Sequence, residues 1–371
     1  MSLLMETVSK SPLNDIANKV INKKRITFDD ALRLYESPDI LLIGAIADLA
    51  RKTRAKKEHM DFAYFIHNHH LNITNICKGN CKFCAYRKEE AAPDAFFLEI
   101  KQIEDYLTNN VLPDIKELHI VSAINKKANL KYYIDLFDVC KKILPETHIQ
   151  GLTAVEIDYL SNLEKTSPEE ILTVLTSAGL GSLPGGGAEI FHPTIRSNVC
   201  PDKISSDRWL QIMEIAHKLH IKSNATMLTG IGETYFHRVD HMDRIRTLQD
   251  NTNGFMTFIP LVCHYENTNL NIPENNTGID NLKDLAISRI YLDNIPHIKS
   301  FWIQLGIKLA QISLAFGVDD LDGTVVKEKI SSAAGANSNH QVTRDLLINL
   351  IKNASRIPVE RDTVYNIIEI F

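Results

Sequence analysis

Three of the six cysteines in this sequence lie within eight residues, at Cys77, Cys81 and Cys84. Their spacing, with three and then two intervening residues, allows three thiolates on one loop to face a common centre. Thiolates are soft ligands that suit an iron–sulfur cluster more than a hard cation. Clusters bound by cysteine alone usually have four ligands, so three leave one iron open to bind a substrate. The spacing therefore predicts a 4Fe–4S cluster with one open iron.

Two other interpretations of these cysteines remain. A structural zinc site would need a fourth ligand, which His67, His69 or His70 could provide. The three thiols could also be unrelated to one another. The other cysteines are scattered and are expected to be small buried residues: Cys140, Cys200 and Cys263. A disulfide framework is not expected, because nothing indicates export and a chain of 371 residues can stabilise its own core.

Two glycine-rich segments further along the chain lead into glutamates. Gly185–Gly187 precedes Glu189, and Gly230–Gly232 precedes Glu233. Glycine has no Cβ, so these segments would let the backbone come close to a bulky ligand. Glu189 could then bind ligand hydroxyls or an ammonium group, with Glu156 competing for the same role. A structural salt bridge and simple glycine turns are the alternatives.

From about residue 69, short β-rich runs alternate with amphipathic helical stretches. The expected strands are His70–Ile76, Glu117–Val121, His148–Ala154, Ser182–Ile190, Lys222–Leu228, Gly254–Leu261, Ser300–Gln304 and a short run near Val318–Leu321. The expected helices between them are Glu99–Thr108, Lys131–Ile143, Pro168–Ser177, Ser206–Leu219, Arg238–Leu248 and Ala286–Ile295. This alternation predicts an α/β fold, a (β/α)₈ barrel of the TIM type, full or partly open. A doubly wound sheet is the alternative, although it normally carries a glycine-rich turn where this chain has its cysteines.

The regions outside the barrel are expected to be helical and to pack with it as one domain. Thr27 and Asp30 predict a capping box at the start of one N-terminal helix. The chain is expected to finish in an apolar helix, residues 367–371, that closes the barrel. The expected regions are an N-terminal helical segment (1–68), the barrel (69–330) and a C-terminal helical extension (331–371).

Composition excludes several classes of protein. The chain is 44% hydrophobic and 23% charged, as an ordinary globular domain is. Its net charge of −5 gives no basic field for nucleic acid or an anionic membrane. No apolar run reaches the roughly 18 residues of a membrane helix, and residues 1–10 do not resemble a signal peptide. A cytoplasmic protein is expected.

The cysteine motif resembles that of the radical S-adenosylmethionine (SAM) superfamily. In that superfamily the open iron binds the amino and carboxylate groups of SAM, and the reduced cluster cleaves the sulfonium to a 5′-deoxyadenosyl radical. Other segments are similar to the aminofutalosine synthase family of the futalosine route to menaquinone: Thr153–Ile157, Ser182–Ile190, Asn224–Glu233, His237–His241, Ile259–Leu261, Leu292–Ile298, Asp319–Thr324 and Arg356–Asp362. The Pro-Gly-Gly-Gly-Ala-Glu and Asp-Asp-Leu-Asp-Gly segments discriminate best, because dehypoxanthine futalosine cyclases and deazaflavin-forming synthases look different there.

The resemblance implies a reaction. The adenosyl radical adds to the enol-ether double bond of 3-[(1-carboxyvinyl)oxy]benzoate, the aryl group migrates, and carbon dioxide is lost as hydrogencarbonate. The products are 6-amino-6-deoxyfutalosine and methionine, so SAM is consumed as a cosubstrate. Flavodoxin or ferredoxin is the implied electron donor. A hydrogen-abstracting relative, such as the cyclase of the same pathway, and a cluster-binding regulatory protein are the alternatives.

The resemblance also implies roles for particular residues. Phe83 and Tyr86 would border the cluster or the adenine, and the Gly230–Glu233 segment would pair with the base through its backbone. Glu189 or Glu156 would hold the ribose hydroxyls or the methionyl ammonium. Where superfamily members commonly carry Gly-Gly, this chain has Ser122 and Ala123. The hydroxyl of Ser122 could replace one backbone contact to the methionyl group.

The implied substrate carries two carboxylates, so cations are expected near it. Arg238 and His237 open a predicted helix, whose N-terminus favours anions, and arginine can pair with a carboxylate bidentately. An ordinary salt bridge is the alternative for Arg238. Asp293 is expected to fix a loop or to act on the departing carboxylate. His297 could share that role. Weaker candidates for the cation site are Arg196, His264 and Asn267, and alternate residues among Asn72, Thr74 and Asn75 should point into the barrel. The acidic run Asp319, Asp320 and Asp322 is expected to be solvated or to make hydrogen-bonded turns rather than a metal site.

Overall fold

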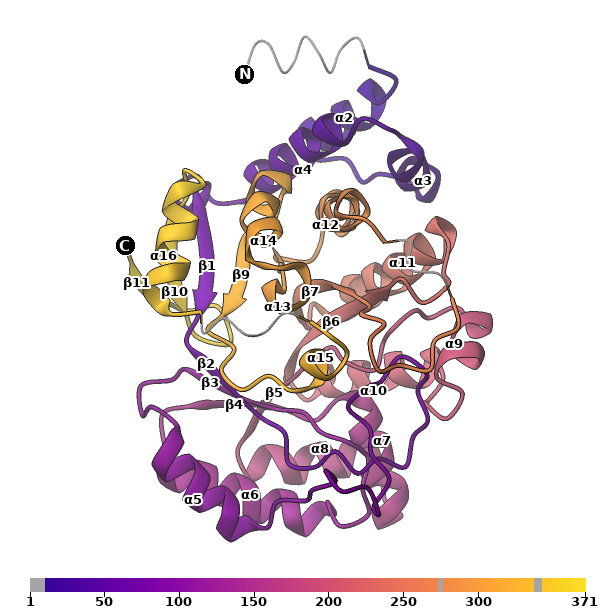
Figure 1. The fold of residues 1–371 in the computed structure, drawn as a ribbon. Coiled ribbons are helices and arrows are strands. Elements are labelled where there is room, and N and C mark those ends of the chain that lie inside the picture. The colour runs from indigo at the N-terminus through magenta and orange to yellow at the C-terminus, as the bar shows by residue number, and fades with distance from the viewer. Residues whose placement is uncertain (1–10, 273–275, 337–341) are drawn as a thin grey trace.

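The computed structural model describes residues 11–272, 276–336 and 342–371 (Figure 1). The expectation for residues 1–10 lies outside the described residues. From residue 11 onward the described chain begins with the helices α2 (Asn14–Ile21), α3 (Phe28–Glu36) and α4 (Ile40–Arg54), followed by the 3₁₀ turn η1 (Lys57–His59). The predicted capping box is confirmed, because the Thr27 side chain accepts from the Asp30 N–H and the Asp30 carboxylate accepts from the Thr27 N–H.

A curved sheet of seven parallel strands forms most of the barrel, in the order of the chain. The strands are β2 (Asn68–Leu71), β3 (Glu117–Ile120), β4 (His148–Gly151), β5 (Leu180–Leu183), β6 (Lys222–Thr229), β7 (Phe255–Val262) and β8 (His297–Ile298). An eighth strand, β9 (Asp320–Gly323), is joined to the end of β8 by the Lys299–Asp320 bridge and pairs on its other side with β1 (Phe62–Ile66), which leads into β2. The predicted TIM-type barrel is confirmed.

Helices cover the outside of the strands. They are α5 (Ile100–Asn110), α6 (Leu130–Ile143), α7 (Ala154–Glu164), α8 (Pro168–Ser177), α9 (Pro193–Val199), α10 (Ser206–Lys218), α11 (Tyr235–Thr252), α12 (Gly278–Tyr291), α13 (Trp302–Leu305) and α14 (Ile307–Ser313), followed by the turn η2 (Leu314–Phe316). Figure 1 shows α5, α6, α7 and α8 on the outer side of β2 to β5. The buried faces of α5, α6 and α8 are apolar, as the 3.6-residue pattern of the sequence predicts.

Some expected boundaries of strands are wrong. The first barrel strand ends at Leu71, because residues 72–76 leave the sheet and Thr74 bridges to Phe97 instead. Strand β5 ends at Leu183, since the following proline and glycines leave the ladder. The run 300–304 is not a strand: β8 lies just before it, and α13 begins at Trp302.

The two ends of the chain are also less helical than expected. The N-terminal region finishes in strand β1, and the described part of the C-terminal region (331–336 and 342–371) contains one long helix, α16 (Arg344–Asn353), after the short helix α15 (Ile330–Ala333). The expected final helix is wrong: the chain ends in an antiparallel hairpin, β10 (Ile357–Arg361) and β11 (Ile367–Ile370). The β-branched isoleucines of β11 favour a strand, and β10 pairs in parallel with β1.

The C-terminal hairpin closes the barrel at its amino end, opposite the loops that follow the strands. The Tyr365 hydroxyl donates to Asp320 at 2.7 Å, and its ring stacks on His297 with 3.8 Å between ring centroids. Asp320 pairs with Tyr64 in β1 and His297 pairs with Thr257 near the start of β7, so both lie low in the barrel. No helix within the described ranges is long and apolar enough to cross a membrane.

Gly185 gives a test of this packing. A Cβ there would lie 2.7 Å from backbone atoms of Ala225 in β6, so Gly185→Ala should lower the free energy of unfolding by about 1–3 kcal/mol. Chemical denaturation measures this change. Gly278→Ala is the matched control, because its Cβ would meet only Leu309 at an ordinary 3.9 Å and its stability should be unchanged or higher. Equal effects of the two substitutions would contradict the packing described.

Candidate active site

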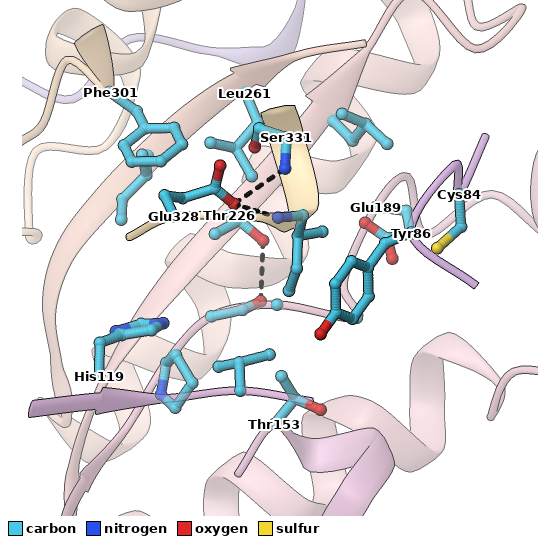
Figure 2. A pocket seen from close by; sticks show the side chains of 18 of the residues that line it. Cys84, Tyr86, His119, Thr153, Glu189, Thr226, Leu261, Phe301, Glu328 and Ser331 are labelled. Atoms are coloured by element: carbon cyan, nitrogen blue, oxygen red, sulfur yellow. Dashed lines mark hydrogen bonds between the residues drawn. The ribbon is translucent and has the colours of Figure 1, made fainter. Parts of the chain in front are cut away.

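A cavity of about 350 Å³ lies inside the barrel and opens toward the loops at the carboxyl ends of the strands. The thiols of Cys77, Cys81 and Cys84 all line it. Figure 2 shows Cys84, Tyr86 and Glu189 on one side of the cavity, with His119 and Phe301 on the other. The cavity therefore has one end at the cysteine loop and another among the strands.

Backbone hydrogen bonds fix the cysteine loop to its neighbours. The Lys78 N–H donates to the Ile124 carbonyl at 2.9 Å, and the Ile124 N–H donates back to Cys77 Sγ at 3.4 Å. The Lys82 N–H donates to the Val199 carbonyl at the end of α9, at 2.8 Å. The loop after β2 is thus held by the loop after β3 on one side and by α9 on the other.

The donor set fits an iron–sulfur cluster. Three thiols face one cavity, and Cys77 Sγ already accepts a backbone N–H, an interaction that tunes cluster sulfurs. Burial raises the pKa of the Cys81 thiol to about 12, so binding a metal centre would displace its proton. Within the described ranges, no three His, Cys, Asp or Glu side chains are already gathered as a metal-ligand group. The loop would draw its thiols together around a cluster.

Ser122 and Glu156 connect three strand ends on the cavity wall. The Ser122 hydroxyl donates to the Thr74 carbonyl at 2.8 Å and accepts from the Thr74 N–H at 2.9 Å. One oxygen of Glu156 accepts from the Ser122 N–H at 3.2 Å, and the other accepts from the Thr153 N–H and hydroxyl. Both predicted residues line the cavity, with their polar atoms occupied by these contacts.

Glu189 forms an ion pair with Lys203 next to the cysteine loop. Burial by itself would lower the pKa of Lys203. The nearby Cys81 and Glu189 raise this pKa by more than burial lowers it, so it lies above its usual value. The Lys203 ammonium also lies 5.1 Å from the Phe83 ring centroid. Glu189 has a left-handed backbone at φ 50°, and the Arg196 guanidinium holds the preceding turn by donating to the Ala188 carbonyl at 2.6 Å.

The glycines before Glu189 serve backbone packing. A Cβ on Gly187 would lie 2.5 Å from Val155 Cγ2, and its φ of +85° also favours glycine. Gly185 likewise leaves no room for a Cβ, because it packs against the backbone of β6. Protein atoms therefore require glycine at these two positions, whereas the sequence suggested that a ligand comes close there.

Four residues that line the cavity carry a buried polar atom without a hydrogen-bond partner among the described residues. These atoms are the Tyr86 hydroxyl, Asn72 Oδ1, Asn224 Oδ1 and Arg87 Nε. A buried polar group without a partner costs about 1–3 kcal/mol, so these atoms indicate that a polar ligand belongs in the cavity. Tyr86, which the sequence singled out, and Asn72, a weaker candidate, are both among them.

Arg238 and the Gly230–Glu233 turn lie outside the cavity wall. Glu233 accepts from the Gly230 N–H at 2.9 Å and from the Arg238 guanidinium at 2.6 Å. Arg238 also ion-pairs with Asp284 at 3.0 Å. Burial by itself would lower the pKa of Arg238, but the two carboxylates raise this pKa by more, so it lies above its usual value. This guanidinium is already bonded to two carboxylates, which argues against a substrate contact.

His237 and Asp293 also lie away from the cavity. His237 Nδ1 accepts from the Thr234 N–H at 3.1 Å, which completes the cap of α11. Asp293 pairs with Arg25 of the N-terminal region at 3.0 Å. Of the residues in the described ranges that line the cavity, none comes from Gly230, Glu233, His237, Arg238 or Asp293.

The polar inner end of the cavity was not predicted from the sequence. The strands there present polar side chains inward: Asn68, His70, Glu117, His119, Gln150, Asn224, Lys299 and Asp322. Lys299 donates to Asp322 at 3.0 Å, and the rings of His70 and His119 stack with centroids 4.5 Å apart. The available signal was alternation: Asn68, His70 and Asn72 all fall on one face of a strand.

The chain matches known proteins along nearly its whole length. The model of the Radical SAM superfamily matches residues 71–245, and that of the CofH/MqnC C-terminal region matches residues 252–371. The aminodeoxyfutalosine synthase of Thermus thermophilus is 38% identical, covering 99% of both chains. The cyclic dehypoxanthine futalosine synthase of Streptomyces coelicolor is 36% identical, covering 96% of this chain and 89% of its own. The FeFe-hydrogenase maturase HydG of Carboxydothermus hydrogenoformans has a TM-score of 0.72 at 14% identity, covering 98% of this chain and 83% of its own.

Glu156 makes stability depend on pH. Burial raises its pKa to about 7, although three hydrogen-bond donors oppose the shift. The native state therefore keeps a proton that the unfolded state has lost, and this stabilisation disappears as pH rises from about 4.5 to about 7. Relative to Glu156→Gln, the wild type should lose roughly 1–3 kcal/mol of unfolding free energy over that range.

Urea denaturation at several pH values measures this difference. Glu170→Gln is the control, because Glu170 caps α8 in the same way but is exposed, with a lowered pKa caused first by its hydrogen bond from Thr166. A constant difference between wild type and Glu156→Gln from pH 4.5 to 7 would show that Glu156 does not titrate there.

Proposed function

This chain belongs to the radical SAM superfamily of enzymes, and we propose that it catalyses the aminodeoxyfutalosine synthase reaction. C5′ of the adenosyl group forms a bond to the terminal alkene carbon of 3-[(1-carboxyvinyl)oxy]benzoate, while its bond to the SAM sulfur breaks and methionine leaves. The aryl group then migrates from oxygen to carbon. The enol-ether carboxylate leaves as hydrogencarbonate with an oxygen from water, and the one electron spent on cleaving SAM is released again in that step. The product is 6-amino-6-deoxyfutalosine.

One observation carries this proposal. The two segments that resemble the aminofutalosine synthases most specifically, Pro184–Glu189 and Asp319–Gly323, both place residues on the wall of the cavity that the three thiols line. The 38% identity to the Thermus thermophilus synthase over the full length supports the same reaction. Similarity to the cyclic dehypoxanthine futalosine synthase makes hydrogen abstraction the competing outcome.

The chain's own residues would bind and enclose the reactants. Cys77, Cys81 and Cys84 would hold a 4Fe–4S cluster, which supplies the electron that breaks the carbon–sulfur bond of SAM. Tyr86 and the Glu189–Lys203 pair border that end of the cavity and would contact SAM. Flavodoxin or ferredoxin is the electron donor we propose. Closure against water matters, because an alkyl radical reacts with most nearby C–H bonds.

The segment after β9 would provide that closure. Glu328, Ser331 and Ala334 line the cavity, and Glu328 accepts from the Ile330 and Ser331 N–H groups at 2.8 Å, as Figure 2 shows for Ser331. Gln304 donates to the Ser331 hydroxyl at 3.2 Å. This segment covers the reactants from one side, and the C-terminal hairpin closes the other end of the barrel.

The reaction is tested with anaerobically reconstituted, reduced protein supplied with SAM and 3-[(1-carboxyvinyl)oxy]benzoate. Mass spectrometry should find a product that contains the adenine and the aromatic ring and has lost one carbon dioxide from the summed adduct. Free 5′-deoxyadenosine as the sole nucleoside product, with the benzoate unconsumed, would contradict the proposal and favour a hydrogen-abstracting reaction on another substrate.

The cluster ligands have their own test. Cys81→Ala should lose the iron–sulfur absorbance and the cleavage of SAM, because two thiols cannot hold the cluster. Cys140→Ala is the control, since Cys140 is buried in α6 and does not line the cavity. Iron and sulfide analysis distinguishes the two. Full iron content in Cys81→Ala, or zinc in the wild-type protein as isolated from cells, would rule out the proposed ligand set.

A further inference from the structure

The inner end of the cavity holds a lysine that the proposed reaction has not yet used. Lys299 follows β8 directly and is only 5% exposed, although it lines the cavity. Its backbone N–H donates to the Phe258 carbonyl in β7 at 3.0 Å. Val262, at the upper end of β7, lies four residues further along, about 13 Å away at the rise of a strand. Lys299 is therefore deep in the barrel, away from the cysteine loop.

The surroundings of Lys299 hold its ammonium in place and leave it able to bind a ligand. Asp322 accepts one hydrogen bond from it at 3.0 Å, and this is its single hydrogen-bond partner within the described ranges. An ammonium has three donors, so two remain for a ligand. Asp322 has a left-handed backbone at φ 65°, which is costly for a non-glycine residue and is typical of functional sites.

Other charges near Lys299 have partners of their own. Glu117 accepts from the Asn68 amide at 3.4 Å, and Asp320 is paired with Arg361. The stacked imidazoles of His70 and His119 face the cavity and are only half-buried within the barrel. Burial lowers the pKa of both rings, so each is neutral at pH 7 and carries one N–H donor.

Between the two ends the cavity wall carries a group of apolar side chains beside the polar Asn72 and Thr226. Val121, Leu228, Ile259, Leu261 and Phe301 line this middle part. Apolar walls with a few polar groups at one end are typical of a site that binds an aromatic ring with a polar substituent. The wall therefore suits the ring of an aryl acid that points its substituent inward.

We propose that Lys299, positioned by Asp322, binds the aryl carboxylate of the substrate at the inner end of this cavity. The inference rests on the proposed function. The alkene must lie at the cysteine end, where the adenosyl group is generated, and the enol carboxylate is attached directly to the alkene. The aryl carboxylate is separated from the alkene by the ether oxygen and three ring carbons, so it is the group that reaches inward.

Equilibrium binding tests the pairing without turnover. The ligands are 3-(1-carboxyethoxy)benzoate, which lacks the alkene, and its analogue with an amide in place of the aryl carboxylate. Calorimetry uses the reconstituted protein with SAM and no reductant. The wild type should bind the diacid about 30-fold or more tightly than the amide, as expected for a desolvated charge pair. For Lys299→Met, the affinities for the two ligands should differ by less than about 3-fold, because the ammonium that pairs with the aryl carboxylate is gone.

Lys283→Met is the matched control. Lys283 is also buried, but it donates to the Tyr35 carbonyl outside the cavity, so this variant should retain wild-type discrimination. Lys299→Gln replaces Lys299→Met if the latter fails to fold or to bind iron. Equal binding of the two ligands by the wild type would overturn the inference, and this comparison needs no variant. Wild-type discrimination by Lys299→Met would overturn it too.

The two proposals fail in different ways. If the wild type transfers no adenosyl group to the enol-ether substrate, the proposed function fails. If the wild type forms the product and Lys299→Met still discriminates between acid and amide, only the role of Lys299 fails. Tighter binding of the amide than of the diacid would instead assign Asp322 and Glu117 as acceptors for a donor ligand.

Discussion

The structure depends on a barrel whose interior contains polar side chains, where most barrels of this type are filled with apolar ones. Asn68, His70, Glu117, His119 and Lys299 face inward from neighbouring strands and cannot collapse into a dry core without losing their hydrogen bonds. Ion pairs and ring stacking give some of these polar side chains partners within the layer. The others face open space, which is the cavity. The same layer separates the reactive end of the cavity from the hairpin that closes the barrel below.

The cysteine loop is the second constraint, because it must present three thiols to that cavity. Its position follows from hydrogen bonds to the loop after β3, which also borders the cavity, and to the end of α9. Ser122, which with Ala123 stands where the resemblance led us to expect Gly-Gly, ties the loop after β3 to Thr74, just before the cysteines. A residue that looked like a departure from the superfamily pattern therefore helps to fix the cysteine loop.

The sequence predicted much of the barrel and the cysteine end of the site. Cysteine spacing is a local signal, and so are the alternating strands and helices, which is why Cys77, Cys81, Cys84, Tyr86 and the TIM-type barrel could be predicted. Arg238 and Asp293 were assigned by residue type and position along the chain. Their partners, Asp284 and Arg25, are distant in sequence, so only the three-dimensional structure reveals these ion pairs. The C-terminal hairpin was missed for the same reason, because β10 forms by pairing with β1.

A crystal structure of the reconstituted protein with SAM and 3-(1-carboxyethoxy)benzoate would test most directly whether one cavity holds both substrates, with SAM at the cysteine end and the aromatic acid reaching the inner end. We expect a 4Fe–4S cluster on the three cysteines, SAM between that cluster and Glu189, and the aromatic ring between Leu261 and Phe301 with its carboxylate at Lys299. An aromatic acid bound at the mouth of the cavity, with the inner end filled by water, would contradict this arrangement. Zinc or a disulfide at the cysteines would contradict the chemistry as a whole.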